Sequence, residues 1–137
     1  MAGPIARTTK TVAKEVLVFP AGLDAIQSVV LQASGVDALP SATTGYVGKL
    51  GLLAGTILRK VSGDSQVRYE AYDGSGTPEG VLGDNIYFFD NTDASDRAAD
   101  MLFHGCVFDI NKLIGYTGNE TAVKAALPTC QFLDKEV

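Results

Sequence analysis

The stretch from Leu50 to Asp84 constrains the fold most, because short apolar runs alternate in it with glycine-rich turns. The run 56–61 is mostly β-branched or aliphatic, and Ala54-Gly55 before it supplies a backbone break at which a strand can begin. A turn at 62–65 follows. The alternating residues 67–72 then predict a half-buried strand.

The alternation in this strand assigns its side chains to two faces. One face would carry Val67, Tyr69 and Ala71, and the other Arg68, Glu70 and Tyr72. A longer loop at 73–78 leads to 80–84, a short apolar run bracketed by glycines. This β-unit contains no catalytic constellation.

Composition supports the same class of fold. The 137 residues are 46% hydrophobic, enough to bury the core of one ordinary domain. Fifteen glycines, 8% aromatic residues and no tryptophan suit a turn-rich β protein better than a helical bundle, where each glycine costs about 1 kcal/mol. We therefore expect a mainly β chain with a single domain.

The charge is distributed unevenly along the chain. The net charge is −5, yet Met1 to Lys14 carries three basic residues and no acid, which leaves −8 for the remainder. An acidic body argues against binding nucleic acid, whose backbone requires clustered lysine and arginine. No apolar run is long enough for a secretion signal or a membrane span, so we expect neither export nor membrane insertion.

The basic segment 1–14 is expected to be an extended arm, and 15–137 the folded domain. The arm has no apolar period and cannot bury enough surface to order itself. Its threonines favour β structure without a partner of their own, which is typical of a strand donated to another subunit. A terminus without a role is the alternative.

The rest of the chain predicts further strands and one helix. We expect short strands at 15–19, 25–32 and 85–89, and a final strand at 130–133. Residues 100–108 are apolar on both alternating faces and predict one central strand, with Gly105 as a bulge or a close backbone approach. Residues 119–127 predict a helix capped by Asn119 and ended by Pro128, which must pack against the sheet to be stable.

The residues that most often hold metals or perform catalysis lack diagnostic spacing here. Asp90, Asp93 and Asp96 step by three, unlike a calcium-binding EF-hand loop, and predict a solvated turn. His104 is expected to be a packed or an interface residue. Cys106 and Cys130 are expected to be buried free thiols, or a disulfide if their strands are neighbours. We expect no metal and no cofactor.

The chain likewise shows no sign of being an enzyme. We find no nucleophile paired with a base and no paired carboxylates at catalytic spacing. Gly74-Ser75-Gly76 lacks the lysine and the following helix of a phosphate-binding loop.

The order of motifs resembles a known family. LLAGTILRKV, a turn, RYEAYDGSGTPEGVLGDNI, DMLFHGCVFDINKL, a brief helix and a last strand together look like the lambda-type head decoration (capsid cement) proteins of tailed bacteriophages. The resemblance covers roughly Leu50 to Leu133 and rests on pattern and order. The segment before Tyr46 is longer than this pattern needs, which leaves open how much of 15–45 is arm.

The resemblance implies a small β-barrel, or β-tulip-like domain, that forms a homotrimer. Such trimers bind the major capsid protein on the outer surface of the virion, at threefold and quasi-threefold positions. There they stabilise the shell against the pressure of packaged DNA, after assembly in the cytoplasm of the host bacterium. The candidate capsid-binding residues of the arm are Ile5, Arg7, Thr8, Thr9, Lys10, Thr11, Val12 and Lys14.

A second hypothesis is a small all-β recognition module that binds a surface glycan. Aromatic rings provide the stacking surface that such a module would need. The candidates are Tyr69, Tyr72, Tyr87 and Tyr116.

Overall fold

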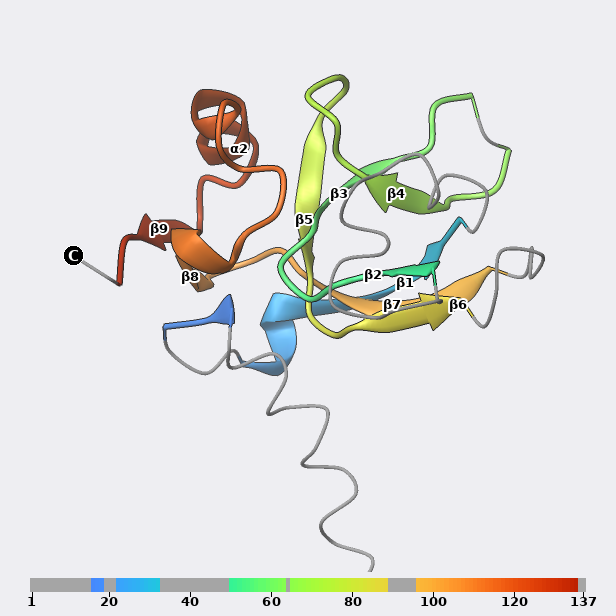
Figure 1. Ribbon diagram of the computed structural model, residues 1–137, viewed down its shortest axis with the longest axis horizontal. Helices are drawn as coiled ribbons and strands as arrows, with labels where there is room; N and C mark the ends of the chain where they lie inside the picture. The colour runs from blue at the N-terminus through green and yellow to red at the C-terminus, as the bar shows by residue number, and fades with distance from the viewer. Residues whose placement is uncertain (1–15, 19–21, 33–49, 64, 89–95, 136–137) are drawn as a thin grey trace, which may run out of the picture.

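The computed structural model describes residues 16–18, 22–32, 50–63, 65–88 and 96–135. These residues form a mainly β fold with a short α-helix, α2 (Glu120–Ala126), near the C-terminus (Figure 1). The strands are β1 (Ile26–Leu31), β2 (Leu50–Leu52), β3 (Ile57–Lys60), β4 (Tyr69–Ala71), β5 (Pro78–Leu82), β6 (Ile86–Phe88), β7 (Arg97–Leu102), β8 (Val107–Asp109) and β9 (Gln131–Leu133). The described residues also include two 3-10 helices, η1 (Leu23–Ala25) and η4 (Ile110–Lys112).

Five of these strands form a closed barrel in the order β1-β4-β3-β5-β7. The longest ladder is antiparallel and joins β1 to β7, from Ile26 opposite Leu102 to Leu31 opposite Arg97. The barrel closes where β1 meets β4 in parallel, with Leu31 opposite Tyr69. The expected small β-barrel with a short C-terminal helix is therefore confirmed, and β1 shows that part of the segment before Tyr46 belongs to the body.

Two smaller sheets accompany the barrel. Strands β2 and β6 pair in antiparallel, and β8 and β9 pair in parallel. Figure 1 shows β8, β9 and α2 together on one side of the barrel. Among the described residues, the body thus consists of a barrel and an adjoining layer made from the C-terminal part of the chain.

The core has two parts because three barrel strands are buried on both faces. Within β3, Leu58 points into the barrel, whereas Ile57 packs under the layer of β8, β9 and α2. In β5 and β7, neighbouring apolar residues likewise belong to different cores. The barrel core consists of Val29, Leu31, Leu52, Leu58, Tyr69, Ala71, Leu82, Ala99 and Met101. The second core consists of Val16, Leu17, Ala25, Ile57, Tyr72, Val81, Leu102, Cys106, Phe108, Tyr116, Val123 and Leu127.

The prediction of one central strand over 100–108 was wrong. Strand β7 ends at Leu102, and the chain turns before β8 begins at Val107. Gly105 lies in this turn with a φ of 66°, a conformation that favours glycine. The apolar run extends across the turn because β7 contributes residues to both cores and β8 contributes residues to the second core.

Two other predicted strands differ in detail. Only Tyr69–Ala71 forms β4, and Val67 is exposed. Tyr72 is buried in the second core together with Ile57, whose carbonyl oxygen accepts a hydrogen bond from the Tyr72 amide at 2.8 Å. Of the predicted strand 15–19, Leu17 makes an isolated antiparallel bridge to Phe108, and residues 15 and 19 lie outside the described residues.

The predicted helix is confirmed as α2, with Val123 and Leu127 buried in the second core. Asn119 occupies the N-cap position as predicted, but its side chain makes no capping hydrogen bond. That side chain instead donates a hydrogen bond to the Gly115 carbonyl oxygen at 3.0 Å. Packing of the apolar stripe therefore contributes more to this short helix than capping does.

Candidate functional site

The predicted arm residues, from Ile5 to Lys14, lie outside the described residues, but residues 16–18, which follow the predicted arm, are described. Val16 and Leu17 are buried in the second core, with 1% and 6% of their surfaces exposed. The Val18 amide donates to the Val107 carbonyl oxygen at 2.8 Å, next to the bridge between Leu17 and Phe108. We call residues 16–18 the root of the arm.

The root lies against β8, whose other edge pairs with β9. Phe108 is opposite Leu17 on one edge and opposite Phe132 on the other. The rings of Phe108 and Phe132 have centroids 5.5 Å apart, and Tyr116 stacks on Phe132 at the same distance. Aromatic packing therefore holds β8 and β9 together next to the root.

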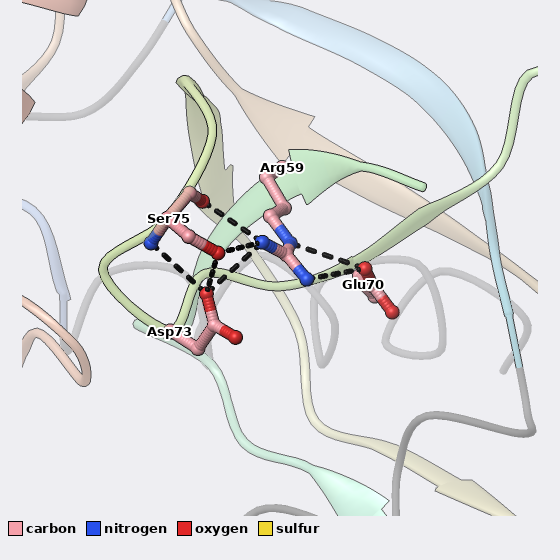
Figure 2. A network of polar contacts seen from close by, with 4 residues as sticks. All are labelled: Arg59, Glu70, Asp73 and Ser75. Atoms are coloured by element: carbon pink, nitrogen blue, oxygen red, sulfur yellow. Dashed lines mark hydrogen bonds and ion pairs between the residues drawn. The ribbon is translucent and has the colours of Figure 1, made fainter. Parts of the chain in front are cut away.

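A network of polar contacts holds the exposed loop 73–77 against the barrel. Figure 2 shows the Arg59 guanidinium between Glu70 on one side and Asp73 with Ser75 on the other. On one side, Nη2 lies 2.8 Å from Glu70 Oε2. On the other, Nη1 donates to Asp73 Oδ1 at 3.0 Å and to the Ser75 carbonyl oxygen at 2.9 Å.

The loop is also tied internally. Both the amide and the hydroxyl of Ser75 donate to Asp73 Oδ1, at 3.0 and 2.7 Å. The Ser75 hydroxyl and amide, followed by the charge of Arg59, lower the pKa of Asp73. Part of this arrangement is visible in the sequence, because Asp-Gly-Ser-Gly is typical of a turn closed by an aspartate side chain. The part that sequence reasoning missed is Arg59, which reaches the loop from β3.

The acidic loop and the histidine have no metal-binding arrangement among the described residues. Asp90 and Asp93 lie outside them, and Asp96 accepts a hydrogen bond from Arg68 Nη1 at 3.2 Å. No group of three potential ligands comes together in the described part of the chain. His104 is exposed, which makes the expectation of a packed residue wrong and leaves its role in an interface as a prediction.

The two cysteines lie side by side just before β8 and β9. Cys106 is buried and Cys130 partly exposed, and both thiols are free. The expectation of free thiols is therefore confirmed, although the residues precede the strands and Cys130 is not fully buried. A side-chain hydrogen bond between the two cysteines lowers the pKa of Cys130, and the same bond together with burial raises the pKa of Cys106.

A carboxylate pair also escaped sequence reasoning. Burial, followed by the nearby charge of Asp100, raises the pKa of Asp84. Oδ1 of Asp84 is buried and accepts no hydrogen bond from the described residues. No sequence signal marks this pair, because β7 brings Asp100 beside Asp84 through tertiary pairing, with the Gly83 amide donating to the Asp100 carbonyl oxygen at 2.9 Å.

The tyrosines suggested for glycan binding are mostly buried. Tyr69, Tyr72 and Tyr116 have 4%, 5% and 6% of their surfaces exposed, so their rings offer no stacking platform. The side chain of Tyr87 lies outside the described side chains. Within the described part of the chain, no helix is long and apolar enough to cross a membrane.

Comparisons with models of protein families, with curated proteins and with solved structures each found no match. The functional assignment therefore depends on the sequence resemblance and on the geometry described above.

Proposed function

We propose that this protein is a head decoration protein of a tailed bacteriophage. It binds the major capsid protein on the outer surface of the virion as a homotrimer, at threefold and quasi-threefold positions, and stabilises the shell against the pressure of packaged DNA. The proposal rests on the resemblance between Leu50 and Leu133, and the barrel with its short helix is compatible with it. The single structural observation that carries it furthest is the buried root of the arm.

A buried root is useful to an arm that attaches to another protein. Val16 and Leu17, which follow segment 1–14 closely in the sequence, hold the chain on β8. The barrel is closed, and closure leaves no free edge in it to receive a strand from another protein. A strand of the capsid protein therefore cannot easily be added to this barrel. The arm can more readily be added as a strand to a sheet of the capsid protein.

The energetics require more than main-chain pairing. Ordering the arm costs about 1 to 2 kcal/mol per residue, whereas each hydrogen bond gains about 0.5 to 1.5 kcal/mol. Burial of Ile5 and Val12 and attraction between the three basic residues and an acidic shell surface must supply the rest. In a trimer, three such arms act together, so a modest affinity for each arm becomes firm attachment of the whole.

The oligomeric state is the first test. Sedimentation equilibrium of the full chain at micromolar concentration should yield the mass of a trimer. A protein that stays monomeric in solution and also on particles would contradict the proposal.

Deletion of residues 1–14 is the second test. The variant keeps the buried Val16 and Leu17, so it should fold and form trimers as the full chain does. Binding would be measured to expanded, undecorated heads of tailed phages, and the deletion should weaken it at least about tenfold.

A scrambled arm is the matched control for this deletion. It keeps the composition and the charge of residues 1–14 but changes their order, so it separates electrostatic attraction from specific strand pairing. Full-strength binding by the scrambled arm would assign attachment to charge alone. Full-strength binding by the deletion variant would show that the arm has no role and that the body carries the attachment surface.

A further inference from the structure

The two cysteines occupy equivalent positions in neighbouring strands. Strands β8 and β9 run parallel with Val107 opposite Gln131, so the residues that precede them, Cys106 and Cys130, are opposite each other by continuation of the register. The Gln131 amide donates to the Cys106 carbonyl oxygen at 2.9 Å, which shows that the pairing reaches this position. Paired strands lie about 4.7 to 4.9 Å apart, within the Cα separation of about 4.4 to 6.8 Å found in disulfides.

The side chains agree with this pairing. A side-chain hydrogen bond between the two cysteines shifts the pKa of each, the Cys106 thiol also donates to the His104 carbonyl oxygen at 3.6 Å, and neither cysteine forms a disulfide. Cys106 is only 2% exposed, whereas Cys130 is partly open to solvent. A reagent from solution therefore reaches Cys130 first, and Cys106 lies directly behind it.

The surroundings of Cys130 favour its thiolate form. The side-chain hydrogen bond with Cys106 lowers the pKa of Cys130 most, and the Thr129 hydroxyl and the nearby His104 lower it further, against the opposite effect of burial. The turn that carries His104 is fixed against this site, because the Gly105 amide donates to Thr129 Oγ1 at 3.1 Å. Such an environment is typical of a reactive cysteine rather than of an inert core thiol.

We propose that Cys106 and Cys130 form a dithiol site that low-molecular-weight disulfides oxidise to an intramolecular disulfide joining the starts of β8 and β9. This inference is independent of the proposed function.

The chemistry proceeds by two thiol–disulfide exchanges. The Cys130 thiolate attacks one sulfur of a disulfide RSSR; a Cys130–SR bond forms, the S–S bond of the reagent breaks, and one RS⁻ leaves. Cys106 then loses its proton to RS⁻ and attacks Cys130 Sγ; the Cys106–Cys130 bond forms and the second RS⁻ leaves. Together the two protein thiols lose two electrons and two protons, and the reagent gains them as two RSH.

The order of attack follows from the pairing. While Cys130 is a thiolate, its hydrogen bond and charge hold the proton on Cys106. Once Cys130 carries SR, that charge has gone, and Cys106 ionises more readily at the moment when its target sulfur is in place. The attacking and resolving roles are therefore assigned to Cys130 and Cys106.

The test uses the full-length reduced protein and oxidised glutathione, followed by alkylation and intact mass measurement. The wild type should lose about 2 Da and resist alkylation, and peptide mapping should join Cys106 to Cys130. Cys106→Ser should stop at a mixed disulfide with glutathione, about 305 Da heavier. Cys130→Ser should react at least about tenfold more slowly, because its remaining thiol is buried.

A second measurement needs no variant and therefore does not depend on how well the serine variants fold. Phenylarsine oxide, which bridges two adjacent thiols, should bind the reduced wild type with one-to-one stoichiometry. Two independent alkylations without any disulfide, a disulfide that forms only in urea, or the absence of arsenical binding would each overturn the proposal.

Discussion

Gly55, just before β3, lies against the backbone of Lys112 in η4, and replacing it by alanine should destabilise the protein severely. Its φ is 98°, and a Cβ there would lie 2.1 Å from the Lys112 carbonyl oxygen. A left-handed conformation costs a residue with a Cβ about 1 to 2 kcal/mol. Relief of the clash requires the two backbones to separate by about 1 Å, since real Cβ contacts essentially never fall below 3.0 Å.

That separation would disrupt hydrogen bonds on both sides of Gly55. Its amide donates to the Leu82 carbonyl oxygen at 2.8 Å, and the Ile114 amide donates to its carbonyl oxygen at 2.9 Å. Losing one buried hydrogen bond costs about 1 to 3 kcal/mol, whereas alanine recovers only about 0.4 to 1 kcal/mol through the unfolded chain. The free energy of unfolding should therefore fall by about 2 to 4 kcal/mol.

Gly63→Ala is the matched control, because Gly63 also has a positive φ, of 71°, but a Cβ there meets nothing within 4 Å. It should cost only about 1 kcal/mol. Urea denaturation followed by circular dichroism, at one protein concentration for all variants, measures both changes. If the two variants differ by less than about 1 kcal/mol, the contact with Lys112 is not what requires glycine at position 55.

Two further predictions concern carboxylates. Because burial and Asp100 raise the pKa of Asp84, ionisation destabilises the folded state as pH rises above 3.8. Asp84→Asn should thus raise the free energy of unfolding at pH 7 by on the order of 1 kcal/mol. Urea titrations should show no such gain at about pH 3, where the carboxyl is protonated in both states. An equal gain at both pH values would contradict the role assigned to ionisation of Asp84. Ser75→Ala should raise the pKa of Asp73, measured by NMR titration, more than Arg59→Gln does, because hydrogen bonds from Ser75 lower it most; the reverse order would refute the assignment.

The sequence predicted the strands well where a local pattern decides the structure. The break at Gly55, the strand after it and the apolar run at 80–82 appear as β3 and β5, and Val123 and Leu127 place α2 on the core. In each case the residues concerned are neighbours in the chain, so periodicity and turn chemistry carry the information.

The prediction of one strand over 100–108 failed because this apolar run contributes residues to two different cores. Residues 101–103 and 106–108 look like one strand because a strand buried on both faces shows no alternation. The contribution of Arg59 to the loop 73–77 and the approach of Asp100 to Asp84 depend on which strands pair, and a single sequence does not encode that as a local pattern. The cysteines show the same limit: their spacing fits no motif, yet the parallel pairing of β8 and β9 brings them together.

Strand β8 connects the two proposals. The root of the arm pairs with one edge of β8 through Leu17, β9 pairs with the other, and the thiols precede both strands. A disulfide would therefore restrain the layer that holds the root, whereas the barrel is held by its own five-stranded ladder. In the oxidised protein, hydrogen exchange of the Val18 amide, which donates to the Val107 carbonyl oxygen, should slow at least about threefold. The Leu82 amide, which donates to the Thr56 carbonyl oxygen in the barrel, should exchange at an unchanged rate. Equal slowing at both positions would mean that the disulfide stabilises the whole domain, and no change at Val18 would mean that the root is independent of the thiol pair.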